Sequence, residues 1–561
     1  MKTTKKVIAM LLAATATMSM VACGGNDGES ENVCEIKALI SGYDVDWLDA
    51  AATAFNTAFK DEGYEVKITL KDSSINANQE ILSPKRNTTD LYFENNNINT
   101  LIEKSRSVLG SNGGALLEDL SDVLDSKAIN AKGEEEGDII RNRLDEKILG
   151  ACKYAGTLNG FDGYYGLPMG KSATGVYVNK KVLEQKGYTL DDFLTTDGLL
   201  NVVQELAPAN PLDETAFFPV AWSGLKAPGY WDYLAQVLFA QYTGLENYDN
   251  FWDFIPTTGT QEDNGYTVYS DQGILEALNV IEELENTDYA VPGTSSMDHI
   301  GAQARVFMGN SLMVVSGDWI YKEMEKDFGQ YLNDVVAIKT PVLSAVGVKL
   351  GLCGSEHAEV ENQVMESCAN CESALKSIVK DIDGNTLMNE EIAAKHTGVS
   401  VEDVQIIRER RGYYLDQAGI SVAIPSYANA KDVAKKFLRF MYSTDGAKIY
   451  QQNTHEWLTV KEIEKADTSA LSEIDRLIYE KKNLDSSIGL RMDTSNVMRS
   501  QNTGMGLSAA YGSPLIYSNL AYSHSTNGNP SVTAEIAFQA GKRTAKNNWN
   551  DWLANAGLNQ R

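Results

Sequence analysis

Three cysteines and one histidine lie within a short stretch of the chain, at Cys353, His357, Cys368 and Cys371. Three thiols and one imidazole at this spacing can form a tetrahedral zinc site. A disulfide within the cluster or simply buried thiols would suit the same spacing. A single CxxC with an unusual pair of partners is a weak signal. We therefore expect no metal and no cofactor, and zinc remains the weaker candidate.

Another of the six cysteines, Cys23, indicates lipid attachment. Three lysines precede an apolar run, 7–21, and small Ala22 stands directly before Cys23. Secretory leaders have this build, and Met20-Val21-Ala22-Cys23 resembles a lipobox. The run is shorter than the ~20 residues of a transmembrane span. We expect a signal peptide over 1–22, acyl chains on Cys23, a flexible tether over 23–33, and anchoring at the outer face of the cytoplasmic membrane.

Aromatic residues are concentrated between Phe217 and Phe254, where twelve of 38 residues are aromatic. Aromatic rings either build a core or line a binding face, and their flat surfaces suit the C–H groups of sugars. Trp222, Tyr230 and Trp231 lie in loop-like sequence within this window, which favours a binding face.

Charge and motifs exclude several classes of function. The formal charge of −28 repels phosphate backbones, so we expect no nucleic-acid partner. Gly170-Lys171-Ser172 resembles the end of a phosphate-binding loop, but Tyr165 stands where that loop requires glycine. The chain has no HExxH motif and no serine elbow.

The elements that position these residues begin with a strand, a helix and a strand, predicted at 36–40, 45–60 and 64–70, with Gly63 ending the helix. Short connections between such elements predict a parallel sheet covered by helices. Further expected elements are strands at 90–93, 175–178, 311–315 and 335–338, helices from Lys180 and over 433–442, a loop at 316–319, and a helix pair over 531–558.

Three motifs, in this order and spacing, resemble the family 1 extracellular solute-binding proteins of ABC importers, the group that includes the maltose-binding protein. The motifs are GYYGLP at 163–168 with VYVNKK at 176–181, FMGN at 307–310 with Met313 and GDW at 317–319, and GISVAI at 419–424 with AKKFLRF at 434–440. The resemblance covers most of the chain from residue 36 to about 452.

The resemblance implies an α/β, two-lobe, periplasmic-binding-protein-like fold of type II, with mixed sheets flanked by helices and two or three crossing segments at the hinge. Lobe I would comprise 34–167 and 419–455, and lobe II 168–341 and 456–561, with a helical insertion at 342–418. The chain would cross near Leu167-Pro168, return near Pro341 and cross again near Trp457.

The implied function is capture of an oligosaccharide between the lobes by a monomer without enzymatic activity. Hinge closure would then present the cargo to a two-subunit ABC permease.

The resemblance places a stacking aromatic at Trp319, with Asp318 beside it to accept sugar hydroxyl protons. Other candidates follow strands of the open sheets, where ligands of α/β folds bind. The full set of expected ligand contacts is Trp319, Asp318, Tyr43, Asp44, Glu94, Asn95, Lys171, Ser172, Trp222, Tyr230, Trp231 and Tyr511, with Tyr517 as a weaker candidate.

Two alternatives remain open. A secreted glycoside hydrolase would need two carboxylates ~5 to 9.5 Å apart. A peptide-binding surface lipoprotein would use Lys171 and Arg491 to hold a carboxylate.

Overall fold

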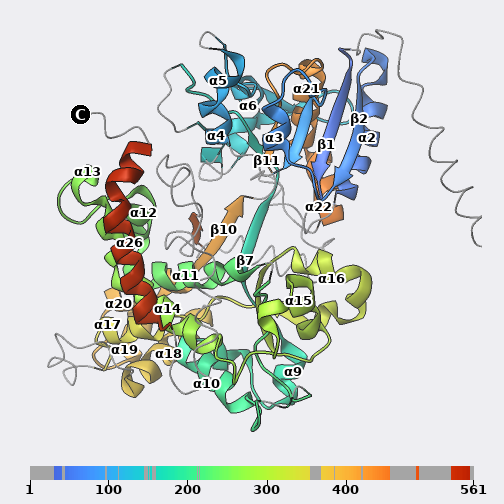
Figure 1. Ribbon diagram of the computed structural model, residues 1–561. Coiled ribbons are helices and arrows are strands. Elements are labelled where there is room, and N and C mark those ends of the chain that lie inside the picture. The colour runs from blue at the N-terminus through green and yellow to red at the C-terminus, as the bar shows by residue number, and fades with distance from the viewer. Residues whose placement is uncertain are drawn as a thin grey trace, which may run out of the picture.

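The computed structural model describes residues 31–555 except for 41–44, 95–97, 111–112, 145–148, 151, 155–159, 212, 214, 226, 354–367, 385, 419–420, 455–487 and 492–531. Two bodies, each built around its own β-sheet, make up the described chain (Figure 1). We call them lobe I, which contains the first strands, and lobe II.

The sheet of lobe I has the order β2-β1-β3-β11-β6. Its strands are β1 (Val33–Leu39), β2 (Glu65–Asp72), β3 (Leu91–Glu94), β6 (Leu167–Pro168) and β11 (Ser421–Ala423). The first three run parallel, as the strand–helix–strand pattern predicts, and β11 is antiparallel to both of its neighbours. The alternating burial along β1 buries Cys34, Ile36 and Ala38.

Helix α2 (Asp46–Ala58) covers this sheet with Trp47, Leu48 and Phe55, because its apolar residues recur at helical spacing. Gly63 ends the following turn in the left-handed conformation, with φ +77°, which glycine adopts without strain. The other elements of lobe I are α3 (Ala77–Ile81), α4 (Ile98–Glu103), α5 (Ser105–Leu109), α6 (Ser121–Leu124), the hairpin β4 (Lys127–Ile129) and β5 (Glu135–Ile139), α7 (Ile140–Arg143), α21 (Lys431–Met441) and α22 (Thr444–Thr454).

The sheet of lobe II is centred on β7 (Lys171–Asn179), which pairs antiparallel with β8 (Met313–Gly317), β9 (Val335–Ala337) and β10 (Tyr413–Ala418). Strand β12 (Ile488–Arg491) lies parallel to β10 at the edge. Asn179 caps α9 (Lys180–Gln185), since its side chain accepts a hydrogen bond from the Val182 N–H. The predicted strand and helix of this segment are thus confirmed.

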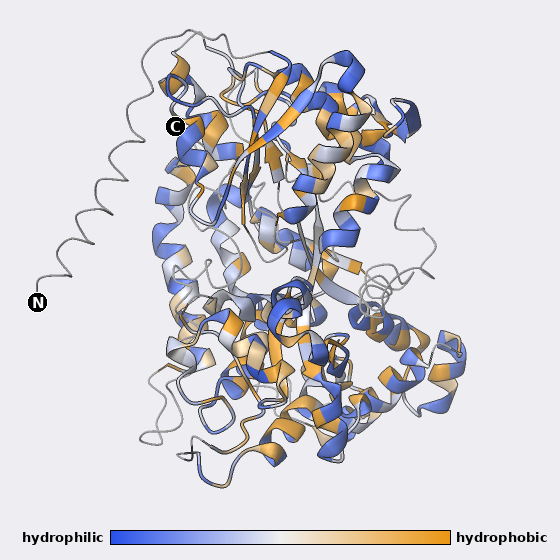
Figure 2. Cartoon of the chain, turned by 90° about the vertical axis from the view of Figure 1, so that its right-hand side faces the viewer, coloured by the Kyte–Doolittle hydropathy of each residue, from blue (hydrophilic) through white to orange (hydrophobic). Residues whose placement is uncertain are grey.

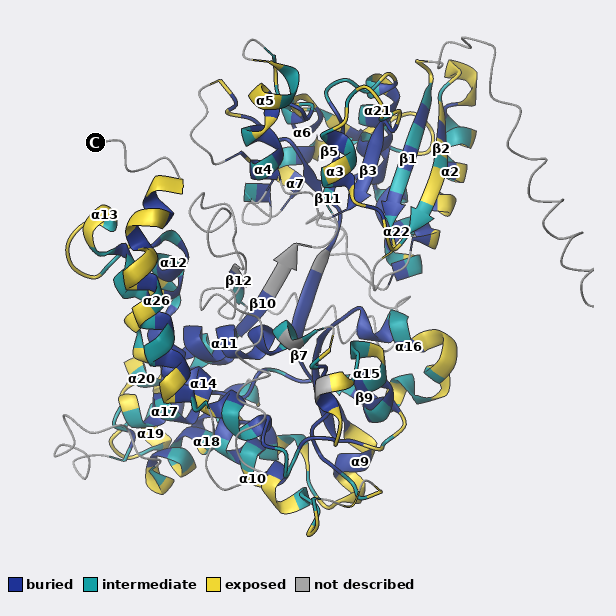
Figure 3. Cartoon of the chain, viewed as in Figure 1, coloured by how far each residue is buried: buried dark blue, intermediate teal, exposed yellow. Residues whose placement is uncertain are grey.

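The aromatic window forms the centre of the lobe II core. Every residue of α11 (Asp232–Thr243) is buried, and Tyr248 and Trp252 of α12 (Leu245–Asp253) pack against it. The hydrophobic residues run through the interior of both lobes in Figure 2, and Figure 3 shows α11 and β7 buried. Other helices of lobe II are α10 (Thr196–Leu206), α13 (Gln261–Asn264), α14 (Gln272–Leu284), α15 (His299–Phe307) and α16 (Ile320–Phe328).

One continuous helix, α26 (Ala534–Asn555), replaces the helix pair predicted at the C-terminal end. It lies along lobe II in Figure 1 and buries Trp549 and Trp552 against the 254–269 region. Gly541 lies buried inside the helix, where tertiary packing outweighs its low helical propensity.

The segment 342–418, expected as a helical insertion, contains α17 (Ser344–Lys349), α18 (Ala369–Asp383), α19 (Asn389–Lys395) and α20 (Val401–Arg411). These helices share a small core of their own with Leu194 and Val342. The segment ends in β10, which belongs to the lobe II sheet.

Within the described residues the chain passes from β6 of lobe I to β7 of lobe II at 168–171, as expected. Strand β10 of lobe II is followed in sequence by β11 of lobe I, and the two residues between them, 419–420, lie outside the described residues. The prediction that the chain returns to lobe I near Pro341 is wrong, because Val342 pairs with Thr195 and α17 continues within lobe II. Trp457 lies outside the described residues, in the interval between α22 of lobe I and β12 of lobe II.

Candidate functional site

The chain connects the two sheets where it passes from β6 to β7. In lobe I, Ser421 pairs with both Glu94 and Pro168. In lobe II, Lys171 pairs with Ala418, and Thr174 pairs with Gly317. Two residues, Met169 and Gly170, separate Pro168 from Lys171, a span of at most about 11 Å. The end of β3 and the junction after β8 therefore lie on either side of the same crossing.

Trp319 lies at this junction, as the residue before α16. The loop predicted over 316–319 is shorter than expected, because β8 extends to Gly317. The indole covers Gly317 so closely that a Cβ at that position would overlap the ring. Trp319 is 9% exposed, so the fold fixes the ring in position.

Two tyrosines complete an aromatic group around Trp319. The ring centroids of Tyr230 and Tyr233 lie 5.8 and 5.9 Å from that of Trp319, and 5.1 Å from each other. Tyr230 is half-buried while Tyr233 is buried, so Tyr230 offers more surface to a ligand.

Glu323 adds a carboxylate to this group. Its side chain is 11% exposed, and its Oε1 lies 3.5 Å from Nε2 of His299. Its other oxygen, Oε2, is buried without a hydrogen-bond partner among the described residues. Burial, together with the charge of Glu323, raises the pKa of Tyr230, and burial raises the pKa of Tyr233. Both phenols therefore stay protonated and can donate hydrogen bonds at neutral pH.

Asp318 ties β8 to β7. One carboxylate oxygen accepts a hydrogen bond of 3.0 Å from the Ala173 N–H, and the Asp318 N–H donates to the Ala173 carbonyl. The residue is 2% exposed. In the described structure this carboxylate orients the junction that carries Trp319.

Glu94 lies on the lobe I side of the crossing. Its carboxylate accepts a hydrogen bond from the Ala77 N–H at the start of α3. Burial raises the pKa of Glu94. Ser172 is likewise buried, opposite Gln417 in the sheet, and Lys171 occupies the first position of β7.

Trp222 and Trp231 belong to the core, which corrects their assignment to an exposed binding face. They are 4% and 1% exposed, and their ring centroids lie 6.2 Å apart. The loop-like sequence around Trp231 forms a short 3₁₀ helix, Pro228–Trp231, that turns this indole inward and leaves Tyr230 nearer the surface.

Several sequence candidates lie outside the described residues. These are Tyr43, Asp44, Asn95, Tyr511, Tyr517, Cys23 and His357; of Arg491 only the backbone is described.

Three residues in or beside the aromatic group were not predicted from the sequence: Tyr233, His299 and Glu323. Helical spacing could have found two of them. Tyr233 follows Tyr230 by three residues, and Glu323 follows Trp319 by four, so each pair shares one helical face. His299 comes from α15, and no local pattern connects it to α16.

The three described members of the cysteine cluster do come together. The sulfur atoms of Cys353, Cys368 and Cys371 all lie within 4.8 Å of one another.

Among the described helices, none has the length and apolar character needed to cross a membrane.

A curated relative covers part of the chain. The xylose/arabinose-binding protein XacG of Haloferax volcanii is 23% identical over 311 residues, which is 54% of this chain and 57% of the relative. The alignment thus spans little more than half of the relative's length.

Solved structures match nearly the whole chain. An ABC transporter solute-binding protein from Thermotoga lettingae TMO, bound with alpha-D-tagatose, matches with a TM-score of 0.56 at 12% identity. The match covers 92% of this chain and all of that one. A chitin oligosaccharide binding protein matches with a TM-score of 0.54 at 12% identity, over 92% and 99% of the two chains. These likenesses confirm the predicted two-lobe α/β fold.

The family model described as bacterial extracellular solute-binding protein matches residues 50–362, more than half of the 561 residues. The chain therefore belongs to the family of bacterial extracellular solute-binding proteins.

Proposed function

We propose that this protein captures a carbohydrate, in the size range of an oligosaccharide, between its two lobes and delivers it to an ABC permease by hinge closure. The aromatic group of Tyr230, Tyr233 and Trp319, with the unfilled acceptor Oε2 of Glu323 beside it, is the observation that carries this proposal. Sugars combine flat C–H surfaces with hydroxyl donors, and this group offers rings and an acceptor together.

The position of the group supports a role in closure. It lies at the lobe II end of the crossing, and Glu94 lies on the lobe I side. A ligand that touched both sides would favour the closed arrangement, because only that arrangement completes its contacts. The names of the relatives agree with a sugar ligand: one binds xylose and arabinose, one holds tagatose, and one binds chitin oligosaccharide.

The boundaries of the moving bodies form part of the proposal. Lobe I comprises 34–167 and 419–455, and lobe II comprises 168–341 and 456–561. The segment 342–418 moves with lobe II, since β10 pairs with β7. The mature protein is a monomer that begins at Cys23 and is held by acyl chains at the outer face of the membrane.

Thermal unfolding of the full chain against pentoses, hexoses, oligosaccharides and peptides tests the ligand class. A ligand at ~100 times its dissociation constant adds about 2.7 kcal/mol to the free energy of unfolding, which raises the melting temperature visibly. We expect a shift with one class of glycan and an unchanged glycan after prolonged incubation. Shifts with peptides alone would contradict the carbohydrate assignment, and cleaved glycan would indicate a hydrolase.

A further inference from the structure

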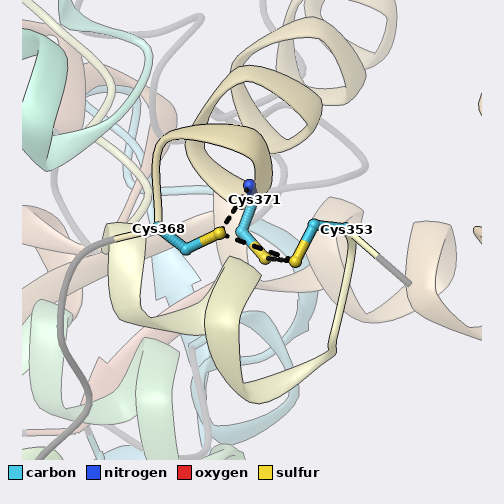
Figure 4. Close-up of side chains that lie close together, drawn as sticks. All are labelled: Cys353, Cys368 and Cys371. Carbon is cyan, nitrogen blue, oxygen red and sulfur yellow. Dashed lines mark hydrogen bonds between the residues drawn. The ribbon is translucent and has the colours of Figure 1, made fainter. Parts of the chain in front are cut away.

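Three thiols from two separate segments converge on one side of lobe II (Figure 4). Cys353 follows α17, whereas Cys368 and Cys371 begin α18. Sγ of Cys353 lies 2.8 Å from Sγ of Cys371 and 3.5 Å from Sγ of Cys368. The cluster is therefore a product of the tertiary fold, and not only of the CxxC spacing.

The packing of the two helices holds the thiols in place. Gly347 of α17 lies against the first turn of α18, where an added Cβ would stand 3.2 Å from the Cys371 carbonyl oxygen. Cys371 is fully buried with Leu352 and Leu375 in the small core of this segment. The Cys371 N–H donates a hydrogen bond to Sγ of Cys368 at the start of α18. Such a hydrogen bond favours a thiolate at Cys368.

We propose that Cys353, Cys368 and Cys371 bind a zinc ion through three thiolates. Zinc–sulfur bonds of about 2.3 Å in a tetrahedral site separate the ligand sulfurs by about 3.8 Å. The two sulfur–sulfur distances that involve Cys353, 2.8 and 3.5 Å, are shorter than that separation, and all three sulfurs lie within 4.8 Å of one another. Side-chain rotation that opens the shortest pair by about 1 Å brings that pair to the separation of two zinc ligands.

The number of thiols favours a metal over a disulfide. A disulfide joins two of the three and leaves the third unpaired beside it, whereas one zinc ion binds all three. Cys353 and Cys368 are only partly buried, which leaves room for water and for entry of the ion.

Charge around the cluster also favours a cation. A cavity of about 160 Å³ borders Cys368, and its lining includes the carboxylates of Asp197, Glu276, Glu283 and Glu372. An acidic cavity concentrates cations near the thiols. The expected role is structural: the ion would fasten the end of α17 to the start of α18, away from the proposed sugar site.

Cobalt(II) tests the proposal, because thiolate coordination to cobalt gives near-ultraviolet charge-transfer bands and intense tetrahedral bands in the visible. The full chain is purified under reductant, stripped with a chelator and titrated with cobalt(II) under anaerobic conditions. We expect both sets of bands to saturate at one equivalent and to disappear when zinc displaces cobalt.

Substitution of the ligands locates the site. Cys368→Ser, at a partly exposed position, should weaken cobalt binding by at least about 100-fold, since even outer-shell changes weaken metal sites 10–100-fold. Cys353→Ser should weaken cobalt binding to a similar degree. Cys152→Ala is the control: it removes a buried thiol outside the cluster and should leave cobalt binding unchanged. Unchanged melting temperatures without metal would show that the serine variants still fold.

Two results would overturn the proposal. One is a reduced chain that develops no cobalt bands, or keeps them in the Cys368→Ser variant. The other is a chain isolated without reductant that carries no zinc and shows, by mass spectrometry, a disulfide between two of the three cysteines. Neither result depends on which sugar the protein binds.

Discussion

At the scale of single residues, position within the fold decides which aromatic side chains can serve a ligand. Trp231 and Tyr230 are neighbours in sequence, yet the indole is fully buried while the phenol remains partly accessible. The 3₁₀ turn at 228–231 separates them. Tyr230, supported by Trp319, is therefore the side chain at which ligand binding is best tested.

Replacement of Tyr230 by alanine should weaken sugar binding by at least about tenfold, equal to about 1.4 kcal/mol, because a ring surface and a hydroxyl donor are lost together. Isothermal titration calorimetry measures the effect. Tyr188→Ala is the matched control, since Tyr188 follows α9, beyond the far end of β7 from the crossing. Equal affinities of the two variants would contradict the assignment.

Glu285 offers a second test at the residue scale. It is fully buried just after α14, and neither carboxylate oxygen has a hydrogen-bond partner among the described residues. Burial, and to a lesser degree the charge of Glu282, raises the pKa of Glu285 well above its usual value. The folded state thus holds a proton that the unfolded chain releases, so the free energy of unfolding falls as pH rises between the unfolded and folded pKa values.

For one proton, the free energy of unfolding falls by at most about 1.4 kcal/mol per pH unit. Glu285→Gln should remove this contribution and be the more stable form at neutral pH. Urea unfolding of both forms at several pH values between about 5 and 8 measures the slope. Glu184→Gln, at an exposed position of α9, should keep the slope of the parent. A variant at Glu285 with the parent's slope would show that the carboxyl does not titrate as inferred.

At the scale of elements, the junction between β8 and α16 presents the aromatic group. Strand β8 ends at Gly317, Asp318 fastens the chain to β7, and α16 starts directly after Trp319. The strand end at Gly317, the hydrogen bond of Asp318 and the start of α16 thus hold the Trp319 indole in one position.

Gly317→Ala should displace the Trp319 indole, because the added methyl would overlap the ring. We expect sugar affinity to fall about as much as in a Trp319→Ala variant, with altered tryptophan fluorescence as a second readout. Gly329→Ala provides the control, since nothing lies within 4 Å of a Cβ there. Parent-like affinity in the Gly317 variant would show that the ring position does not matter for binding.

At the scale of the molecule, short connections join the two sheets: β6 leads into β7 at 168–171, and only residues 419–420, outside the described residues, separate β10 from β11. Few residues need to change conformation for the lobes to rotate about such a hinge. The buried Tyr442 hydroxyl donates to the Pro168 carbonyl at 2.5 Å, which anchors the first crossing to lobe I.

A saturating sugar ligand should therefore reduce the radius of gyration measured by small-angle X-ray scattering. A sugar that raises the melting temperature without binding between the lobes would leave the radius unchanged, and that result would refute closure. The Tyr230→Ala variant, at the sugar concentration that saturates the parent, should show a smaller reduction.

Local pattern in the sequence determined much of the fold. The alternation in β1, the helical spacing in α2 and α21, and the cap of α9 by Asn179 all follow from short-range chemistry, and each element formed close to its predicted range. Three dispersed motifs, read in their order and spacing, were enough to indicate the family.

Contacts between segments far apart in sequence determined the lobe boundaries and the sites. The segment between Pro341 and β10 stays in lobe II because β10 pairs with β7, more than 230 residues away in sequence. The group of Trp319, Tyr230 and His299 gathers side chains from three elements, and the thiol cluster needs α17 packed on α18. Secondary structure follows from local propensity and periodicity, whereas sites and hinges arise from contacts between distant segments, whose free energy depends on the packing of the whole chain.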